Sequence, residues 1–284
     1  MSLGQAISPD LREWIVTQMR AGHSVESLRL SMRQAGWSSH VAEAALAEMQ
    51  GETTLRGAEA SGAAQGSPVP GPDLSQSPLY IECGGQRVQI LQTMKRPNLV
   101  VFGNLVSSEE CEFLIRKAKE RLARSLTVET RTGGEALNVD RTSDGMFFER
   151  GENDVVARLE QRIADLVAWP VIFGEGLQVL RYQPGAQYRP HYDYFDPAEP
   201  GTPSILKRGG QRVATLVMYL QEPEQGGATT FPDVGLEVAP KQGTGVFFTY
   251  DRPDSSTRTL HGGAPVLAGE KWVATKWLRE REFK

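Results

Sequence analysis

The stretch Tyr188-Arg-Pro-His191-Tyr-Asp193 is the most informative part of this chain for both fold and chemistry. Side chains two positions apart on a strand point to the same face, so His191 and Asp193 can approach one metal ion. A third ligand, His261, lies far downstream in a Gly-rich stretch, and Lys271 follows it. Two neutral imidazoles and one carboxylate form a facial ligand set for non-haem Fe(II), which leaves coordination positions open for oxygen chemistry.

Each of these residues also has an ordinary structural interpretation. His191 and Asp193 are compatible with an exposed strand edge, His261 with a turn histidine, and Lys271 with an exposed strand start. The chain has only four histidines, however, and two of them fall in this pattern. A lysine inside a barrel is costly unless it is paired with an anion. If Lys271 points inward, it therefore requires a carboxylate that a ligand supplies.

Length and composition limit the classes of function. A chain of 284 residues is long enough for one large domain and a small one. The net charge of -4 argues against a general nucleic-acid binder. We see no apolar run of membrane-spanning length and no secretory signal in the first residues. The two cysteines are too few for a disulfide framework, so we expect a cytoplasmic protein.

Three regions follow one another along the chain. Residues 1–50 show helical spacing of apolar residues and predict a small three-helix module, which either docks a protein partner or is a plain structural extension. Residues 51–78 are rich in Gly, Ala, Ser and Pro and predict a flexible linker. Residues 79–284 then form the main domain.

The pattern in the main domain is mainly β with flanking helices. A capping box at Ser107 to Glu110 begins one expected helix, and a second is expected at 154–168 before Pro170. Several short strands closed on one another predict a double-stranded β-helix, or jelly roll, with a pocket at its mouth. The expected strands are 88–91, 99–102, 177–182, 188–195, 213–220, 236–238, 245–250 and 272–278.

A series of short motifs accompanies the three metal ligands in residues 99–283. These are Arg141-Thr-Ser143, Leu180-Arg-Tyr182, Gly185-Ala-Gln-Tyr188, Gly209-Gly-Gln-Arg212-Val-Ala-Thr215, Tyr219-Leu220, Gly226-Gly-Ala-Thr229-Thr-Phe-Pro232 and the segment from His261 to Trp277. Their order and content resemble the prolyl 4-hydroxylase family of Fe(II)/2-oxoglutarate-dependent dioxygenases.

The resemblance implies a role for each site residue. His191, Asp193 and His261 hold Fe(II), and Lys271 pairs with the distal carboxylate of 2-oxoglutarate. Tyr182 and Thr229 hydrogen-bond that carboxylate, whereas Tyr188, Arg212 and Trp277 line the substrate side. Taken singly, Tyr182, Tyr188 and Trp277 are also compatible with core aromatics, and Thr229 with an ordinary strand threonine.

The implied reaction is hydroxylation of proline at C4 in a peptide or protein, with decarboxylation of 2-oxoglutarate to succinate and CO2. It uses Fe(II), 2-oxoglutarate and O2, with ascorbate as a reductant. Four alternatives stay open: a free amino acid substrate, another residue type, a zinc hydrolase, and a catalytically silent peptide-binding protein. A zinc hydrolase leaves Lys271 unexplained. Lysyl hydroxylases and nucleic-acid demethylases usually anchor the cosubstrate with arginine, so Lys271 disfavours both.

Two further expectations concern the surroundings of the site. The stretches 129–150 and 194–209 are expected to form the walls of a peptide groove and to order when substrate binds, with Arg131, Arg141 and Phe147 in the first stretch. Arg279 and Arg281 are expected to be solvated charges near the end of the last strand.

Overall fold

The structure is a computed structural model, and it divides into two compact units, Met1–Gln65 and Gly66–Lys284. It describes residues 67–124, 126–128, 135–137 and 142–284, with the backbone alone for the two three-residue pieces. In the first unit it describes five residues, each helical and buried: Ile15, Leu28, Met32, Ala45 and Leu46. The rest of the predicted three-helix module lies outside the described residues.

The boundary between the units falls inside the predicted linker. The Ser67 amide donates to the Asp251 carbonyl (2.9 Å), and the Gly71 amide donates to the Val167 carbonyl (2.8 Å). Pro70 is buried. Residues 67–78 therefore belong to the second unit and bond to the rest of it, whereas residues 51–66 lie outside the described part of the chain.

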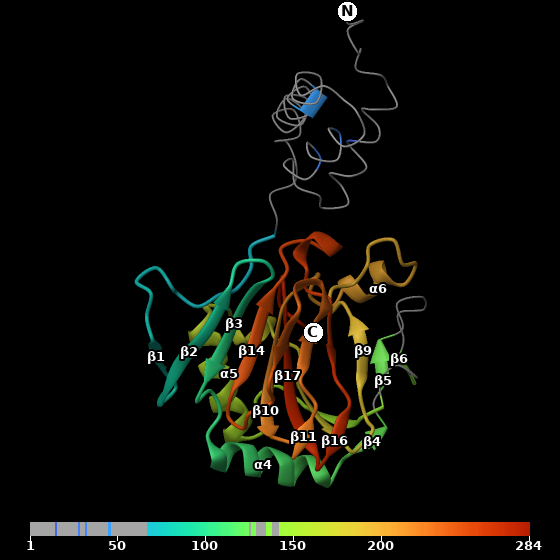
Figure 1. Ribbon diagram of the computed structural model, residues 1–284. Coiled ribbons are helices and arrows are strands. Elements are labelled where there is room, and N and C mark those ends of the chain that lie inside the picture. The colour runs from blue at the N-terminus through green and yellow to red at the C-terminus, as the bar shows by residue number, and fades with distance from the viewer. Residues whose placement is uncertain are drawn as a thin grey trace, which may run out of the picture. The chain divides into compact units, whose positions relative to one another are not determined.

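The second unit is built mainly from antiparallel strands (Figure 1). A nine-stranded sheet has the order β1 (Tyr80–Cys83), β2 (Gln86–Met94), β3 (Asn98–Gly103), β14 (Gly245–Thr249), β10 (Arg212–Gln221), β17 (Lys271–Arg279), β8 (Leu177–Tyr182), β7 (Asp144–Phe148) and β4 (Ala123–Arg124). A four-stranded sheet has the order β13 (Leu236–Val238), β12 (Thr229–Phe231), β15 (His261–Gly263) and β9 (Tyr188–His191). Two short pairs complete the set, β11 (Gln225–Gly226) with β16 (Val266–Ala268) and β5 (Leu126–Val128) with β6 (Glu135–Leu137).

Both helices predicted for the main domain are present. Helix α4 (Ser108–Lys119) begins at the predicted capping box, in which Ser107 and Glu110 satisfy each other's backbone amides. Helix α5 (Asp154–Val167) begins at Asn153 and ends where Ala168 adopts a left-handed φ of 50°. A short helix α6 (Thr202–Leu206) and the 3-10 turns η2 (Val171–Phe173), η3 (Pro232–Val234) and η4 (Ser255–Thr257) were not predicted.

The large sheet separates two apolar layers, as the alternation of side chains along β10 shows. Ala214, Leu216 and Met218 join the core beneath α4 and α5, because successive side chains of a strand point to opposite faces. Tyr219, by contrast, joins a second core shared with Phe231 of the small sheet. Two antiparallel sheets that enclose one core fit the predicted jelly roll. His191, Asp193, His261 and Lys271 line a small cavity beside this second core.

Some boundaries differ from the prediction. Strand β9 ends at His191 rather than at residue 195, and the following loop contains α6. Among the described residues, no helix is long and apolar enough to cross a membrane.

Candidate active site

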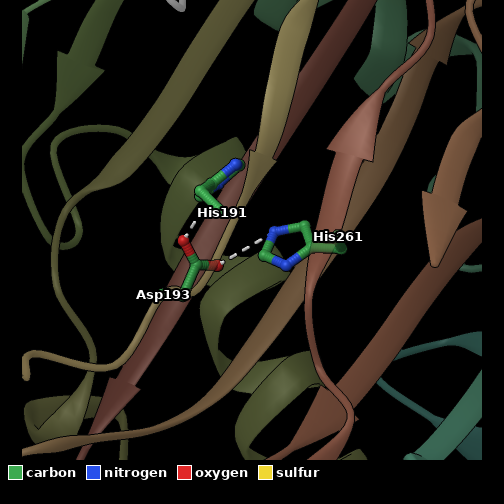
Figure 2. A group of neighbouring side chains, drawn as sticks. All are labelled: His191, Asp193 and His261. Atoms are coloured by element: carbon green, nitrogen blue, oxygen red, sulfur yellow. Dashed lines mark ion pairs between the residues drawn. The ribbon is translucent and has the colours of Figure 1, made fainter. Parts of the chain in front are cut away.

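The three predicted metal ligands lie together in the structure (Figure 2). His191 ends β9, His261 begins β15, and the two are cross-strand partners. Their Nε2 atoms each lie 3.4 Å from a different oxygen of the Asp193 carboxylate. One ligand atom from each residue lies within 4.8 Å of the others. Residues distant in the sequence thus form one compact set of donors.

Asp193 reaches this set from a turn, not from a strand as the sequence had suggested. Because β9 ends at His191, strand alternation does not aim the carboxylate. The Thr215 hydroxyl of β10 instead donates to Asp193 Oδ2 (2.7 Å), and the Tyr250 hydroxyl lies 2.9 Å from Thr215 Oγ1. Since Thr215 gives its only proton to Asp193, Tyr250 donates to Thr215. The turn also receives a bond from Arg212 Nη1 to the Asp193 carbonyl (3.4 Å).

Backbone carbonyls fix the tautomer of both histidines. His191 Nδ1 lies 2.9 Å from the Arg189 carbonyl, and His261 Nδ1 lies 2.9 Å from the Thr259 carbonyl. A carbonyl only accepts, so each Nδ1 carries the proton and each Nε2 keeps a free lone pair facing Asp193. The donor set therefore fits a first-row metal ion with two imidazoles and one carboxylate.

The ionisation states of the site also suit a metal. Burial raises the pKa of Asp193, but His261, His191 and Arg212 outweigh it and hold the pKa well below its ordinary value. Burial lowers the pKa of His261 to about 4, with Asp193 and the Thr259 carbonyl opposing this shift. At neutral pH the carboxylate is ionised and His261 is neutral, as metal ligation requires.

Lys271 is a buried cation at the start of β17. It is 4% exposed, and burial lowers its pKa to about 8. Its Nζ lies 5.4 Å from the ring centre of Tyr182 and 5.6 Å from that of Tyr219. Among the acidic side chains of the described residues, none forms an ion pair with it. Burying an ammonium without an acidic partner is costly, so Lys271 is suited to bind an anionic ligand.

A small inner cavity joins Lys271 to the metal ligands. It has a volume of about 50 Å³ and is lined by His191, Asp193, His261, Tyr182, Thr229 and Lys271, among others. The Tyr219 hydroxyl donates to Thr229 Oγ1 (2.8 Å), which leaves the Thr229 proton free for a ligand. Ammonium and hydroxyl groups at one end, with metal ligands at the other, fit a keto-diacid that binds the metal by its keto end.

A larger groove opens on the other side of the metal ligands. Its volume is about 700 Å³, and it shares Tyr188, His191, Asp193 and Trp277 with the inner cavity. The ring centres of Tyr188 and His191 lie 3.7 Å apart in a stacked arrangement. The three residues predicted for the substrate side, Tyr188, Arg212 and Trp277, all line this groove.

Comparisons with known proteins place the chain in a family. Residues 177–279 match the model of the 2OG-Fe(II) oxygenase superfamily. Prolyl 4-hydroxylase 5 of Arabidopsis thaliana is 44% identical over 210 residues, which cover 66% of this chain and 70% of the relative. This chain belongs to the prolyl 4-hydroxylase family. It is an Fe(II)- and 2-oxoglutarate-dependent dioxygenase, and its reaction is proline hydroxylation.

Other prolyl hydroxylases are similar over comparable lengths. A probable prolyl 4-hydroxylase 3 of Arabidopsis thaliana is 40% identical over 222 residues, covering 71% of this chain and 75% of the relative. A viral collagen prolyl hydroxylase from Paramecium Bursaria Chlorella virus-1, solved as a 2-oxoglutarate complex, is 31% identical. That likeness covers 64% of this chain and 95% of the viral one, with a TM-score of 0.48.

Sequence reasoning missed Glu175, which lines the groove of this prolyl 4-hydroxylase, and was wrong about Arg279. Glu175, which follows η2, accepts from Arg212 Nε (2.7 Å) and Nη2 (2.9 Å). Arg279 Nε lies 3.2 Å from the same carboxylate. Arg279 was expected to be solvated, but it is only 2% exposed because β17 continues one residue further and turns this side chain inward. The sequence did contain a signal for this position. Arg279 lies on the same face of β17 as Lys271, Thr275 and Trp277, because alternate residues of a strand share a face.

The predicted groove walls are described only in part. Residues 129–134 and 138–141, with Arg131 and Arg141, lie outside the described residues. Phe147 of β7 is exposed and lines the groove, whereas Phe148 is buried. In the second wall, Phe195 is held through both backbone groups by the Gln211 side chain. The start of that wall is therefore fixed by hydrogen bonds before any substrate binds.

Proposed function

We propose that this prolyl 4-hydroxylase oxidises C4 of a prolyl residue within a peptide that lies along the groove. The observation that carries this proposal is the meeting of the two cavities at His191, Asp193 and Trp277. The inner cavity suits the cosubstrate, and the outer groove of about 700 Å³ is in the range of sites that hold extended ligands. A free amino acid would leave most of the groove unfilled.

The lining of the groove favours a Pro-containing backbone. Aromatic-lined grooves bind polyproline II segments, because flat rings pack against pyrrolidine rings and the ligand is already extended. The aromatic residues that line this groove are Phe147, Phe148, Tyr188, Tyr192, Tyr194, Phe195, Trp277 and Phe283. Trp277 is 8% exposed, and its buried Nε1 has no hydrogen-bond partner among the described residues.

The protein residues perform separable tasks in the proposed reaction. His191, Asp193 and His261 would hold Fe(II), while Lys271, Thr229 and Tyr182 would hold the distal carboxylate of 2-oxoglutarate. Iron, 2-oxoglutarate and O2 supply the oxidation, in which one oxygen atom enters the C–H bond and the other enters succinate as CO2 leaves. The protein positions the reacting carbon and keeps the pocket dry.

Arg212 is suited to fix the peptide beside the metal ligands. Its Nε and Nη2 are held by Glu175, and its Cζ lies 4.1 Å from the ring centre of Trp277. The Arg212 guanidinium is thus held on one edge and stacked on one face. It loses little conformational entropy when its remaining N–H groups bind a peptide carbonyl, so this bond costs less free energy.

Three less direct assignments belong to the same proposal. Ascorbate would act as the reductant in turnovers without peptide, as the resemblance implies. Residues 1–50 would dock a protein partner, and the location would be cytoplasmic. Support for these points comes from the sequence alone.

The test is reconstitution with Fe(II) and 2-oxoglutarate without oxygen, followed by addition of air and a pool of Pro-containing peptides. Mass spectrometry should show a gain of one oxygen, amino-acid analysis should give 4-hydroxyproline, and succinate should form in equal amount. The matched control is Asp193→Ala with the same peptides. Hydroxylation of free proline but of no peptide would replace this proposal with the amino-acid alternative. Peptide binding without succinate would favour a silent binding protein.

A further inference from the structure

At one end of the groove, three arginines alternate with two phenylalanines in the order Arg212, Phe195, Arg279, Phe283 and Arg208. We call these five residues the arginine ladder. Arg212 Cζ lies 4.8 Å from the ring centre of Phe195, and Arg279 Cζ lies 5.0 Å from the same ring. Arg279 Cζ also lies 5.2 Å from the ring centre of Phe283, which Arg208 Cζ approaches to 4.8 Å. The ladder therefore runs from Arg212, beside the Asp193 backbone, to the exposed Arg208 at the rim.

The arginine ladder carries more positive charge than its surroundings neutralise. Among the acidic side chains of the described residues, Glu175 pairs with the ladder, and it is shared by Arg212 and Arg279. Arg208 donates from Nε to the main-chain oxygen of Lys284, the last residue of the sequence (3.0 Å), and forms no ion pair with an acidic side chain of the described residues. Glu175 is shared by two of the three guanidiniums, so the arginine ladder keeps a net positive charge. Burial lowers the pKa of Arg279 to about 10, so this group too is charged at neutral pH.

Arg279 is not fully satisfied by its neighbours: its Nε reaches Glu175 only as an ion pair at 3.2 Å. Arg279 is 2% exposed, yet its Nε and Nη1 make no hydrogen bond among the described residues. The Asp193 carboxylate does not neutralise Arg212 by direct contact, because its oxygens face His191, His261 and Thr215. Buried charge surrounded by apolar rings focuses its field into the adjoining groove.

Four members of the ladder, Arg208, Arg212, Phe195 and Phe283, line the same groove as the proposed peptide. The protein as a whole is acidic, with a net charge of -4, so a basic end of the groove is not a consequence of general composition. We infer that the arginine ladder binds a carboxylate of the substrate, and that preferred substrates carry an acidic side chain near the hydroxylated proline. This inference rests on the proposed function and names its substrate class.

Matched peptides test the inference. One peptide has a Pro flanked by Gln residues, and its relatives carry a single Glu at each position from three before to three after the Pro, all with amidated ends. Glu on one side of the Pro should lower KM about fivefold, which is the effect of one ion pair near a surface. The advantage should shrink as NaCl is raised, since salt screens such pairs. Anisotropy of labelled peptides without oxygen should show the same ratio in affinity.

Variants assign the effect to the ladder. In Arg208→Gln the KM ratio between the Gln and Glu peptides should fall toward one, and Arg208→Glu should favour a Lys peptide instead. Arg87→Gln, on β2 and outside the groove, removes an exposed arginine as a matched control and should keep the ratio. A Gln peptide with a free C-terminus separates a terminal carboxylate from an acidic side chain, and we expect the internal Glu to bind better.

Equal KM values for Glu and Gln at every position would overturn the inference, as would a Glu advantage that persists in Arg208→Glu. Both results would leave the proposed function intact, because the peptides would still be hydroxylated. Absence of hydroxylation in every peptide, with the anisotropy ratio retained, would refute the proposed reaction but support the ladder.

Discussion

At the scale of single residues, Lys271 is the residue that we propose binds the cosubstrate. Its burial without an anionic partner lowers its pKa to about 8 in the free protein. A bound carboxylate favours the ammonium form and raises that pKa again. Binding and protonation are therefore coupled.

This coupling predicts how the affinity for 2-oxoglutarate varies with pH. Below about pH 8 the ammonium is already charged, so the affinity should be constant. Above pH 8 the free protein loses the proton that the complex keeps, and Kd should rise by up to about tenfold per pH unit. Calorimetric titration of the Mn(II)-loaded protein without oxygen measures this. Lys271→Arg is the control, because its guanidinium stays charged and its Kd should be flat. A flat profile for the wild type would show that Lys271 does not bind the cosubstrate.

Thr215 and Tyr250 are predicted to act on the metal through Asp193. Thr215→Val removes the hydroxyl that holds Asp193 Oδ2 and should weaken metal binding about 10- to 100-fold. Tyr250→Phe leaves the Thr215 bond in place and should have a smaller effect. Mn(II) titration measures both affinities, and circular dichroism checks that the variants fold. Wild-type affinity in Thr215→Val would mean that the turn alone positions the carboxylate.

The sequence predicted which polar residues come together better than it predicted the residues that hold them in place. His191, Asp193, His261 and Lys271 stand in a recognisable series of motifs, and the structure brings all four to one cavity. Glu175 and Thr215 could not be found in this way, because their partners depend on which strands become neighbours. Asp193 was placed on a strand because β-like residues continue past His191, but β9 ends at His191 and side chains of β10 bond to Asp193.

At the scale of secondary-structure elements, β17 serves two layers. Lys271, Thr275 and Trp277 line the inner cavity, whereas Trp272, Ala274 and Leu278 join the core under the helices. Lys276 interrupts that apolar face. It pairs with Glu160 of α5 and also donates to the Glu175 carbonyl, so it ties the helix to the backbone behind Arg212.

The pair of Lys276 and Glu160 gives a prediction for stability. Both residues are 2% exposed, so Lys276→Met would leave a buried carboxylate without its cation. The free energy of unfolding should fall by about 3–5 kcal/mol. The double variant Lys276→Met with Glu160→Gln removes both charges and should recover most of the loss. Urea unfolding followed by tryptophan fluorescence measures this. A loss below about 1 kcal/mol in the single variant, the size expected of an exposed pair, would contradict a buried and coupled pair.

The sequence predicted the limits of a helix or strand correctly where residues close together in the chain determine them. The capping box at Ser107 begins α4 as predicted, and strand β8 has its predicted limits of Leu177 and Tyr182. Strands such as β4 and β7 were missed because they are completed by pairing with distant segments, which a single sequence does not show.

At the scale of the whole molecule, the boundary near residue 65 predicts the effect of truncation. Deleting residues 1–65 should leave the melting temperature of the second unit, and its activity on short peptides, unchanged. Deleting residues 1–78 should destabilise it, because Ser67 and Gly71 bond to the unit and Leu74 packs against its core. Thermal melts of both truncated proteins measure the two melting temperatures. Equal melting temperatures would show that residues 67–78 contribute nothing, and failure of the shorter deletion to fold would move the boundary.

The central claim is that three side chains hold Fe(II) while Lys271 holds 2-oxoglutarate. Crystals grown without oxygen, with Fe(II) and 2-oxoglutarate, and measured at the iron absorption edge test it most directly. We predict one anomalous peak bonded to His191 Nε2, His261 Nε2 and Asp193, with a carboxylate of 2-oxoglutarate against Lys271 Nζ. Iron bound elsewhere, or 2-oxoglutarate bound away from Lys271, would contradict the claim.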